Sequence, residues 1–284
     1  MGVMEMKRLI LTMSFPIMIS MLVQALYNIV DSMFVARVSE AALNAVSICY
    51  PVQMIMVAVA CGTGVGINAL LSRSLGEQKP ETAEQVAMHG LFLAACSWIV
   101  FALIGLFCAE AFLSLFASDA EIMAMGVSYM QICTICSIGV FAEIAYERIM
   151  QSTGNPIYNM IIQGAGALIN IILDPILIFG MFGLPQMGVS GAALATVIGQ
   201  IAAMFLGAYI TRRKVKEIQV RLRKFRIDPR LIARMYRIAV PAILMQSVMS
   251  FMTVMMNMIL VSFSALAVSV FSIYYKLQQF VFMA

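Results

Sequence analysis

Long apolar runs follow one another along almost the whole chain, separated by short polar segments. Seven runs reach about 20 residues, the length that an α-helix needs to cross a bilayer. They lie at about 12–36, 44–71, 86–109, 122–147, 156–180, 188–211 and 231–262. An eighth apolar run begins near Ala265 and continues to Ala284. The pattern therefore predicts an all-α integral membrane protein whose spans are separated by turn-forming segments such as "LGEQKPE" and "QSTGNP".

The composition supports this prediction. Of the 284 residues, 62% are hydrophobic and 11% are charged, whereas a soluble domain is about 45–50% apolar and about 25% charged. The six cysteines lie in apolar runs, so we expect small packing residues rather than a redox or metal pair, even for "CTIC" at 133–136. The first apolar stretch continues past Val35 without a small-residue cleavage site, and we expect no cleavable signal.

Lysines and arginines gather in the loops on one side of the predicted bundle. With the N-terminus inside, 16 of the 18 lie in inner segments, whereas the outer loops hold only Arg37. This asymmetry predicts a multi-pass protein of the cell inner (cytoplasmic) membrane with a cytoplasmic N-terminus. We expect the basic segment at 212–228 to lie against anionic lipid rather than nucleic acid. Asp228 and Pro229 are a typical N-cap and first helical residue, so the seventh helix should begin there.

The first and seventh apolar runs are similar to each other. "FPIMISMLVQALYNIVD" aligns with "VPAILMQSVMSFMTVMM", which pairs Pro16 with Pro241. Parallel repeats are common among transporters. A repeat unit of six helices predicts a lobe at 1–211, a basic cytoplasmic loop at 212–228, and the start of a second, incomplete lobe at 229–284.

Two aspartates lie well inside the predicted spans. Asp31 belongs to the first span and Asp174 to the fifth, in the segment "NIILDP". An aspartate at the centre of a spanning helix costs about 2.5–3.5 kcal/mol on insertion scales, so such residues usually have a function. At a rise of about 1.5 Å per residue, both aspartates and Thr196 of the sixth span should lie at one depth in the outer half.

Other polar groups accompany these aspartates. Asn170 lies one turn before Asp174 on the same face. Pro175 cannot donate a hydrogen bond, so the carbonyl of Ile171 could face the same cavity. Carboxylate, amide, hydroxyl and carbonyl oxygens are ligands for Na⁺, and transporters bind coupling ions at interrupted helices. The predicted coupling-ion site consists of Asp31, Asn170, Asp174 and Thr196.

Polar stripes continue from this site along the first and sixth spans. We expect them to line a substrate cavity, and their members are Gln24, Asn28 and Gln200. The same site could bind a proton instead of Na⁺, since two neighbouring carboxylates repel each other. A polar cluster that only fixes helix packing is the third possibility. The second copy of the repeat argues against it, because Met256 occupies the position that matches Asp31.

Two further segments have simpler interpretations. Glu143, Glu147 and Arg148 lie near the inner end of the fourth span, where we expect an ion pair rather than a substrate site. The glycine-rich segment "CGTGVGINALLSRSLGE" mimics a phosphate-binding loop, but it follows no strand and lies in a helical span. We therefore expect its glycines to serve close helix packing or local bending.

The segments "FPIMISMLVQALYNIVDSMFVARV", "QSTGNPIYNM", "NIILDP" and "GVSGAALAT" resemble the multidrug and toxic compound extrusion family over essentially the whole chain. The closest resemblance is to the bacterial branch of DNA-damage-inducible proteins and Gram-positive drug pumps. It implies a transporter of two six-helix lobes, of which this chain holds the first, helix seven and part of helix eight. It also implies that Asp31, Asn170, Asp174 and Thr196 match the cation site. Pro16 matches the proline at which the first helix bends, and Pro175 is a second candidate hinge.

We therefore expect an antiporter, not an enzyme, that couples Na⁺ or H⁺ entry to the export of drug-like, often cationic compounds. Its partners would be small-molecule substrates and the lipid bilayer, without nucleic acid or a cofactor beyond the coupling ion, and the full-length protein would be a monomer. A lipid-linked oligosaccharide flippase of the same superfamily is the alternative, disfavoured because the lobe has no clear internal arginine. The inside N-terminus and the repeat disfavour a seven-helix receptor. A membrane enzyme is disfavoured because no catalytic cluster lies near a membrane face.

Overall fold

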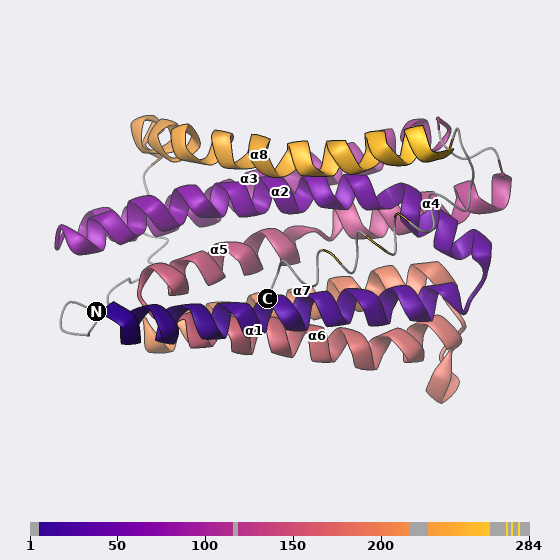
Figure 1. The fold of residues 1–284 in the computed structure, drawn as a ribbon, viewed down its shortest axis with the longest axis horizontal. Coiled ribbons are helices and arrows are strands. Elements are labelled where there is room, and N and C mark those ends of the chain that lie inside the picture. The colour runs from indigo at the N-terminus through magenta and orange to yellow at the C-terminus, as the bar shows by residue number, and fades with distance from the viewer. Residues whose placement is uncertain are drawn as a thin grey trace.

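Eight α-helices form an elongated bundle in the computed structural model, which describes residues 6–115, 119–215 and 227–261 together with Phe271, Tyr274 and Gln278 (Figure 1). The helices are α1 (Met6–Ala36), α2 (Glu40–Gly76), α3 (Pro80–Leu113), α4 (Ala120–Ile135), α5 (Ile138–Ser152), α6 (Pro156–Phe179), α7 (Gly188–Lys214) and α8 (Pro229–Val261). A short 3₁₀ helix, η1 (Met181–Gly183), follows α6. The described residues contain no strand, in agreement with the predicted all-α fold.

Most of these helices are membrane spans by length and composition. Six of them, α1, α2, α3, α6, α7 and α8, are long and apolar enough to cross a bilayer alone. The pair α4 and α5 passes the same test only together, as one span with a bend of 41°. The structure therefore agrees with the seven spans predicted from the apolar runs. The eighth predicted span, from Ala265 onward, falls outside the described residues apart from three isolated positions.

The fourth predicted span, 122–147, is divided after Ile135 in the structure. The Thr134 hydroxyl donates to the carbonyl of Met130 at 2.7 Å, a local bond that often bends helices. The indole N–H of Trp98 on α3 donates to the carbonyl of Ile135 at 2.7 Å. This carbonyl therefore keeps a partner although the helix is interrupted there, which offsets the cost of the bend.

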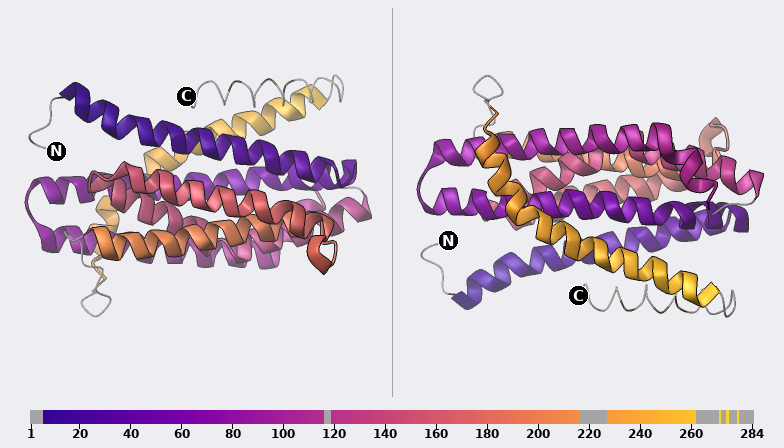
Figure 2. Two further views of the ribbon diagram at one scale, coloured as in Figure 1. Left: turned by 90° about the horizontal axis from the view of Figure 1, so that it is seen from below. Right: turned by 90° about the horizontal axis from the view of Figure 1, so that it is seen from above.

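The helices pack in two groups, one around α6 and α7 and the other around α2, and α5 contacts both groups. α6 packs against α1 and α7, and α7 packs further against α5, whereas α2 packs against α3, α5 and α8. α1 contacts α2 and α7 only slightly, so it is held to the bundle mainly by α6. Figure 2 shows α8 crossing α2 obliquely. Apolar side chains fill both halves of the bundle, with residues such as Leu71 and Ile149 in one cluster and Leu113 and Ile178 in the other.

Glycines allow α8 to approach the backbone of α2. A Cβ atom added to Gly66 would lie 2.7 Å from the carbonyl oxygen of Met235, and one added to Gly62 would overlap Ile243. The two glycines are one helical turn apart and form the kind of small-residue surface that membrane helices use for close packing. The prediction that the glycine-rich segment serves helix packing is therefore confirmed.

The start of α8 is fixed to α3. The backbone N–H of Asp228 donates to Nε2 of the buried His89 at 2.9 Å, and Asp228 Oδ1 accepts from the N–H of Arg230 at 2.9 Å. The helix begins at Pro229, as the N-cap and proline pattern predicts.

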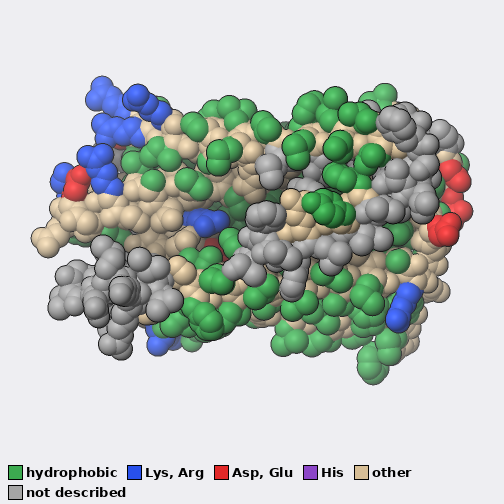
Figure 3. Space-filling model, in the orientation of Figure 1, with side chains coloured by type: hydrophobic (Ala, Val, Ile, Leu, Met, Phe, Trp, Pro, Cys, Tyr) green, Lys and Arg blue, Asp and Glu red, His purple; other side chains and the backbone are tan. Residues whose placement is uncertain are grey.

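Basic side chains gather at the end of the bundle where α1 begins, which we call the basic end (Figure 3). α7 ends there on the basic residues 212–214. In the turn between α2 and α3, Glu77 accepts from Arg73 Nε and from Lys79 Nζ, both at 2.8 Å. The hydrogen bonds from Lys79 and Arg73 lower the pKa of Glu77 to about 2, so it stays ionised at neutral pH.

Replacing Gly66 by leucine should destabilise the protein by about 1–3 kcal/mol, because the side chain has no space against the α8 backbone. Thermal unfolding in detergent would measure the change. Gly76→Ala is a matched control, since nothing lies within 4 Å of a Cβ atom added there. Equal melting temperatures for Gly66→Leu and the wild type would contradict the close approach of α2 and α8.

Candidate cation site

The backbones of α6 and α7 nearly touch at the middle of the two helices. A Cβ atom added to Gly199 would lie 2.8 Å from the carbonyl oxygen of Gly166, and one added to Gly166 would lie 3.3 Å from the carbonyl oxygen of Gly199. The Cβ atom added to Gly199 would also lie 3.4 Å from Cβ of Asn170. Without side chains at these glycines, short polar groups on the two helices can meet directly across the interface.

Asn170 joins α6 to α7 by hydrogen bonds. In the amide orientation that pairs donors with acceptors, its nitrogen donates to Asp174 Oδ2 at 3.2 Å. Its oxygen accepts from the Thr196 backbone N–H at 3.1 Å and from the Thr196 hydroxyl at 3.2 Å. Asn170 is 2% exposed and Asp174 is fully buried. These three residues, called the Asn170 cluster below, therefore form one hydrogen-bonded group, with both ends of the buried amide satisfied.

Asp31 approaches the Asn170 cluster from α1. This helix packs along α6, and the negative charge of Asp31 acts on Asp174. Asp31 is only partly buried, in contrast to Asp174. Two carboxylates held close together inside a bundle repel each other unless a cation or a proton neutralises them. The structure thus brings together all four residues that the sequence assigns to the coupling-ion site.

The three residues predicted to line a cavity are not hydrogen-bonded to the Asn170 cluster in the described part of the chain. Asn28 is exposed, and its amide donates to the backbone carbonyl of Gln24 in the same helix at 2.9 Å. Gln200 packs against α5, where a Cβ atom added to Gly139 would lie 3.0 Å from Cβ of Gln200. Within the described part of the chain, no side-chain hydrogen bond joins any of the three to the cluster. Their predicted role in a substrate cavity stays a prediction.

Both candidate hinge prolines lie inside continuous helices. α1 continues through Pro16, whose carbonyl accepts from the hydroxyl of Ser20 at 2.9 Å. α6 continues through Pro175 and ends at Phe179, and the capping residue Gly180 has a φ of 73°, which suits a glycine at a helix C-terminus. Each helix is therefore continuous through its proline, and bending at either proline stays a prediction.

A second polar group lies around Asp31 on the side of α2 and α4. The amide nitrogen of Gln53 donates to the hydroxyl of Tyr129 at 3.2 Å, and the charge of Asp31 acts on the hydroxyls of Tyr27 and Tyr129. Sequence reasoning did not assign these residues to a site. Tyrosine counts as apolar in a hydropathy pattern, so the only available signal was Gln53 in the middle of an apolar run.

The expected ion pair at the inner end of the fourth span is wrong. Arg148 donates from Nη1 to Oε1 of Gln151 at 2.8 Å, whereas Glu147 accepts from Gln163 Nε2 at 3.3 Å. Among the described residues, the ion pairs within 4.0 Å are those of Glu77. The expectation that the lobe has no internal arginine is also wrong, because Arg148 is half-buried with its side chain against Gly64. The hydrogen bond to Gln151 on the same helix and the contact with Gly64 therefore orient the Arg148 side chain, rather than an ion pair with Glu147.

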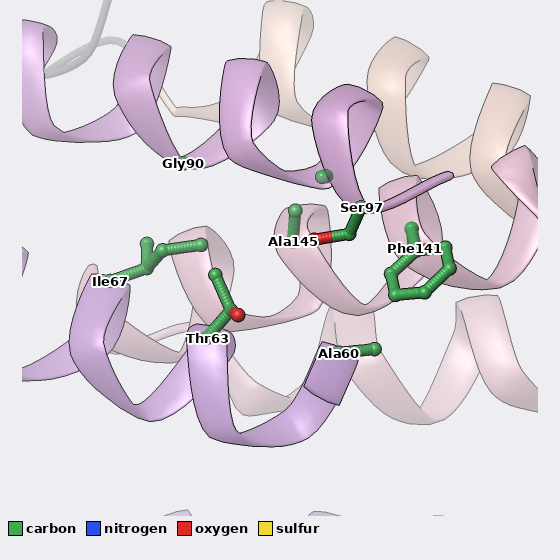
Figure 4. Close-up of a pocket in the computed structure, with 8 residues that line it drawn as sticks. Ala60, Thr63, Ile67, Gly90, Ser97, Phe141 and Ala145 are labelled. Carbon is green, nitrogen blue, oxygen red and sulfur yellow. The ribbon is translucent and has the colours of Figure 1, made fainter. Parts of the chain in front are cut away.

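The core of the bundle contains a cavity between α2, α3 and α5. Thr63, Ser97 and Phe141 are among the residues that line it (Figure 4). It has room for about one water molecule, whereas sites for drug-sized ligands measure about 300–1,000 Å³. This cavity is therefore too small for a drug-like compound.

The donor set of the candidate site suits an alkali cation or a proton. Within the described residues, no group of three or more His, Cys, Asp and Glu side chains is placed to hold a metal ion. Asp31 and the Asn170 cluster instead offer two carboxylates, one amide and one hydroxyl. These are hard oxygen ligands without the nitrogen and sulfur atoms that zinc or copper prefers.

The family profile MatE matches residues 16–176, which is more than half of the chain. The chain belongs to this family. Multidrug export protein MepA of Staphylococcus aureus (strain MRSA252) is 26% identical over 270 residues, which are 94% of this chain and 58% of MepA. Probable multidrug resistance protein YoeA of Bacillus subtilis (strain 168) is 30% identical over 267 residues, which are 92% of this chain and 54% of YoeA.

A solved MATE structure has the same fold. It is the outward-facing conformation of a multidrug resistance MATE family transporter of the MOP superfamily, with a TM-score of 0.89 and 26% sequence identity. The match covers 98% of this chain and 61% of that one. The chain thus spans little more than half the length of its MATE relatives. The predicted fold, an all-α membrane protein that corresponds to part of a MATE transporter, is confirmed.

Replacing Asn170 by alanine should destabilise the protein by about 1–3 kcal/mol, because the buried Asp174 and Thr196 would lose their partner. Thermal unfolding in one detergent would measure this loss. Asn28→Ala is the control, since that amide is exposed and its hydrogen bond among the described residues lies within α1. If both variants melted with the wild type, Asn170 would not hold α6 and α7 together.

Proposed function

We propose that this chain is the ion-binding part of a cation-coupled antiporter that exports drug-like, often cationic compounds across the cytoplasmic membrane. The observation that carries the proposal is the meeting of Asp31 on α1 with the Asn170 cluster of α6 and α7. The names of its relatives support the substrate class, because MepA is a multidrug export protein. Since the chain spans less than two thirds of these relatives, the activity belongs to the complete transporter.

Cation binding would act on α1 more than on any other helix. A cation or proton between Asp31 and Asp174 would remove the repulsion of their charges. α1 is held mainly by α6 and contacts α2 and α7 only slightly. A change in attraction at Asp31 would therefore move α1, whereas Asp174 is held by Asn170 between α6 and α7. Bending near Pro16 is the movement that a proline inside α1 would permit.

Either Na⁺ or a proton could be the coupling ion. Na⁺ would need several oxygen ligands, and the amide oxygen of Asn170 already accepts from Thr196. The Thr196 hydroxyl could rotate its hydrogen away and offer a lone pair to the ion. A proton would need only one carboxylate oxygen of Asp31 or Asp174.

The distribution of charge supports a cytoplasmic N-terminus. Arg73, Lys79 and the basic residues 212–214 lie at the basic end of the bundle, whereas Arg37 lies beyond α1 at the opposite end. Positive charge favours the cytoplasmic side of a membrane. The Asn170 cluster would then lie in the outer half of the membrane.

A flippase for lipid-linked oligosaccharides is the second candidate, and Arg148 is the observation that favours it. A half-buried arginine could bind the pyrophosphate of such a lipid. Its immediate neighbours weigh against this function, because Glu143 and Glu147 give this part of α5 a negative balance. Binding of a fluorescent lipid pyrophosphate without any response to cationic dyes would favour the flippase.

Asp31→Asn and Asp174→Asn should each reduce dye efflux at least tenfold, because loss of a carboxylate ligand exceeds the roughly 10–100-fold effect of removing a supporting residue around a bound metal ion. The measurement is the efflux of a fluorescent cationic dye from cells that express the complete transporter. Cells that express either variant should retain more of the dye. Glu110→Gln is the control, since this acid on α3 is exposed. Wild-type efflux from both aspartate variants would exclude the proposed mechanism.

The coupling ion can be identified in the same cells. At constant pH, efflux that stops when Na⁺ is replaced by choline indicates Na⁺ coupling. Efflux that persists in choline but stops when a protonophore abolishes the proton gradient indicates H⁺ coupling.

A further inference from the structure

A second group of acids, of which Glu147 is buried and Glu143 half-buried, lies between α5 and α6, closer to the basic end than the Asn170 cluster. Glu143 and Glu147 are one turn apart on α5, and Glu147 is 4% exposed. From α6, Gln163 donates its amide nitrogen to Glu147 Oε2 at 3.3 Å. Asn159 lies one turn before Gln163 on the same face of α6 and is 7% exposed. We call these four residues the inner acidic group.

Three buried oxygen atoms of the inner acidic group have no hydrogen-bond partner. They are Oε1 of Glu147, Oε1 of Gln163 and Oδ1 of Asn159. The Gln163 amide cannot be reversed to improve this, because its oxygen would then face the Glu147 carboxylate. Buried polar atoms normally have partners, and all three of these atoms are acceptors. A ligand that satisfies them must carry positive charge or donate hydrogen bonds.

Arg148 does not supply that positive charge directly. Its Nη1 donates to Oε1 of Gln151 at 2.8 Å, and its Cγ lies 2.7 Å from the position of a Cβ atom on Gly64. The guanidinium acts on Glu147 through space but forms no ion pair with it within the described residues. Arg148 therefore acts on Glu147 alone of the two carboxylates, its Nη1 is bonded to Gln151, and its buried Nε has no hydrogen-bond partner in the described part of the chain. Two carboxylates beside one arginine leave a negative balance for a cation to neutralise.

The inner acidic group continues the polar face of α6 that carries the Asn170 cluster. Gln163 and Asn170 are seven residues apart, or two helical turns, so they are separated by about 10 Å along the helix. On α1, the hydroxyl of Tyr27 lies within reach of the charges of Glu143, Asp31 and Asp174. Polar groups on α1, α5 and α6 thus connect the two groups inside the lobe.

We propose that Glu143, Glu147, Gln163 and Asn159 form a second binding site for a monovalent inorganic cation. The carboxylates supply the charge, and the amide oxygens complete the set of ligands. The binding itself depends only on the geometry of the inner acidic group. The further inference that this site lies on a path for the ion between the Asn170 cluster and the cytoplasm rests on the proposed function.

Binding of ²²Na⁺ to the purified protein at alkaline pH, where protons compete less, tests the proposal. The number of ions bound at saturation is compared among the wild type, the double variant Glu143→Gln/Glu147→Gln, and Asp174→Asn. Each variant should lose about half of the bound Na⁺, and the variant that combines all three substitutions should lose nearly all of it. Glu110→Gln, which removes an exposed acid on α3, should bind as the wild type does.

The outcomes separate the two sites. Unchanged binding in the double variant, or a wild-type protein that binds no Na⁺, would overturn the second site. Loss in the double variant with full binding in Asp174→Asn would support the second site and count against Na⁺ at the first. Glu147→Asp keeps the carboxylate and should retain saturable binding with weaker affinity. Wild-type affinity in Glu147→Asp at a wild-type melting temperature would overturn the assignment of Glu147 as a ligand.

Discussion

The close approach of α6 and α7 is the constraint on which the candidate site depends. Gly166 and Gly199 leave no space for a side chain between the two backbones, so Asn170 reaches the backbone of Thr196 at 3.1 Å. The same amide donates to Asp174, and the position of this carboxylate on α6 is therefore fixed from α7. A carboxylate that is fixed and shielded from water interacts with an approaching cation more strongly than one that is mobile and hydrated.

The two aspartates of the site differ in how firmly they are held. Asp174 is fully buried between packed helices, whereas Asp31 is partly buried on a helix that packs mainly against α6. A bound cation that attracts both would therefore change the position of α1 more than that of α6 or α7. Under the proposed function, this asymmetry would give the lobe one helix that responds to the ion and a rigid surface against which it responds, as ion-coupled movement requires.

Local spacing predicted the spans and the meeting of four site residues, because helical rise and periodicity determine depth and face without reference to neighbours. Hydropathy could not predict the bend after Ile135, which depends on a hydrogen bond from Trp98 of another helix. It also could not predict that Arg148 would bond to Gln151 instead of Glu147. In each case the competing partner is a hydrogen-bonding group whose position only the folded bundle determines.

The polar face of α6 carries residues of both proposed cation sites. Asn159, Gln163, Asn170 and Asp174 follow one another at intervals of four, seven and four residues, so they form one stripe directed into the lobe. The core cavity between α2, α3 and α5 holds about one water molecule, so the proposed drug-like substrate would not fit there. Under the proposed function, two solutes that occupy different places could still be coupled if both contacted one movable helix, and α1, which among the described helices packs mainly against α6, is the candidate.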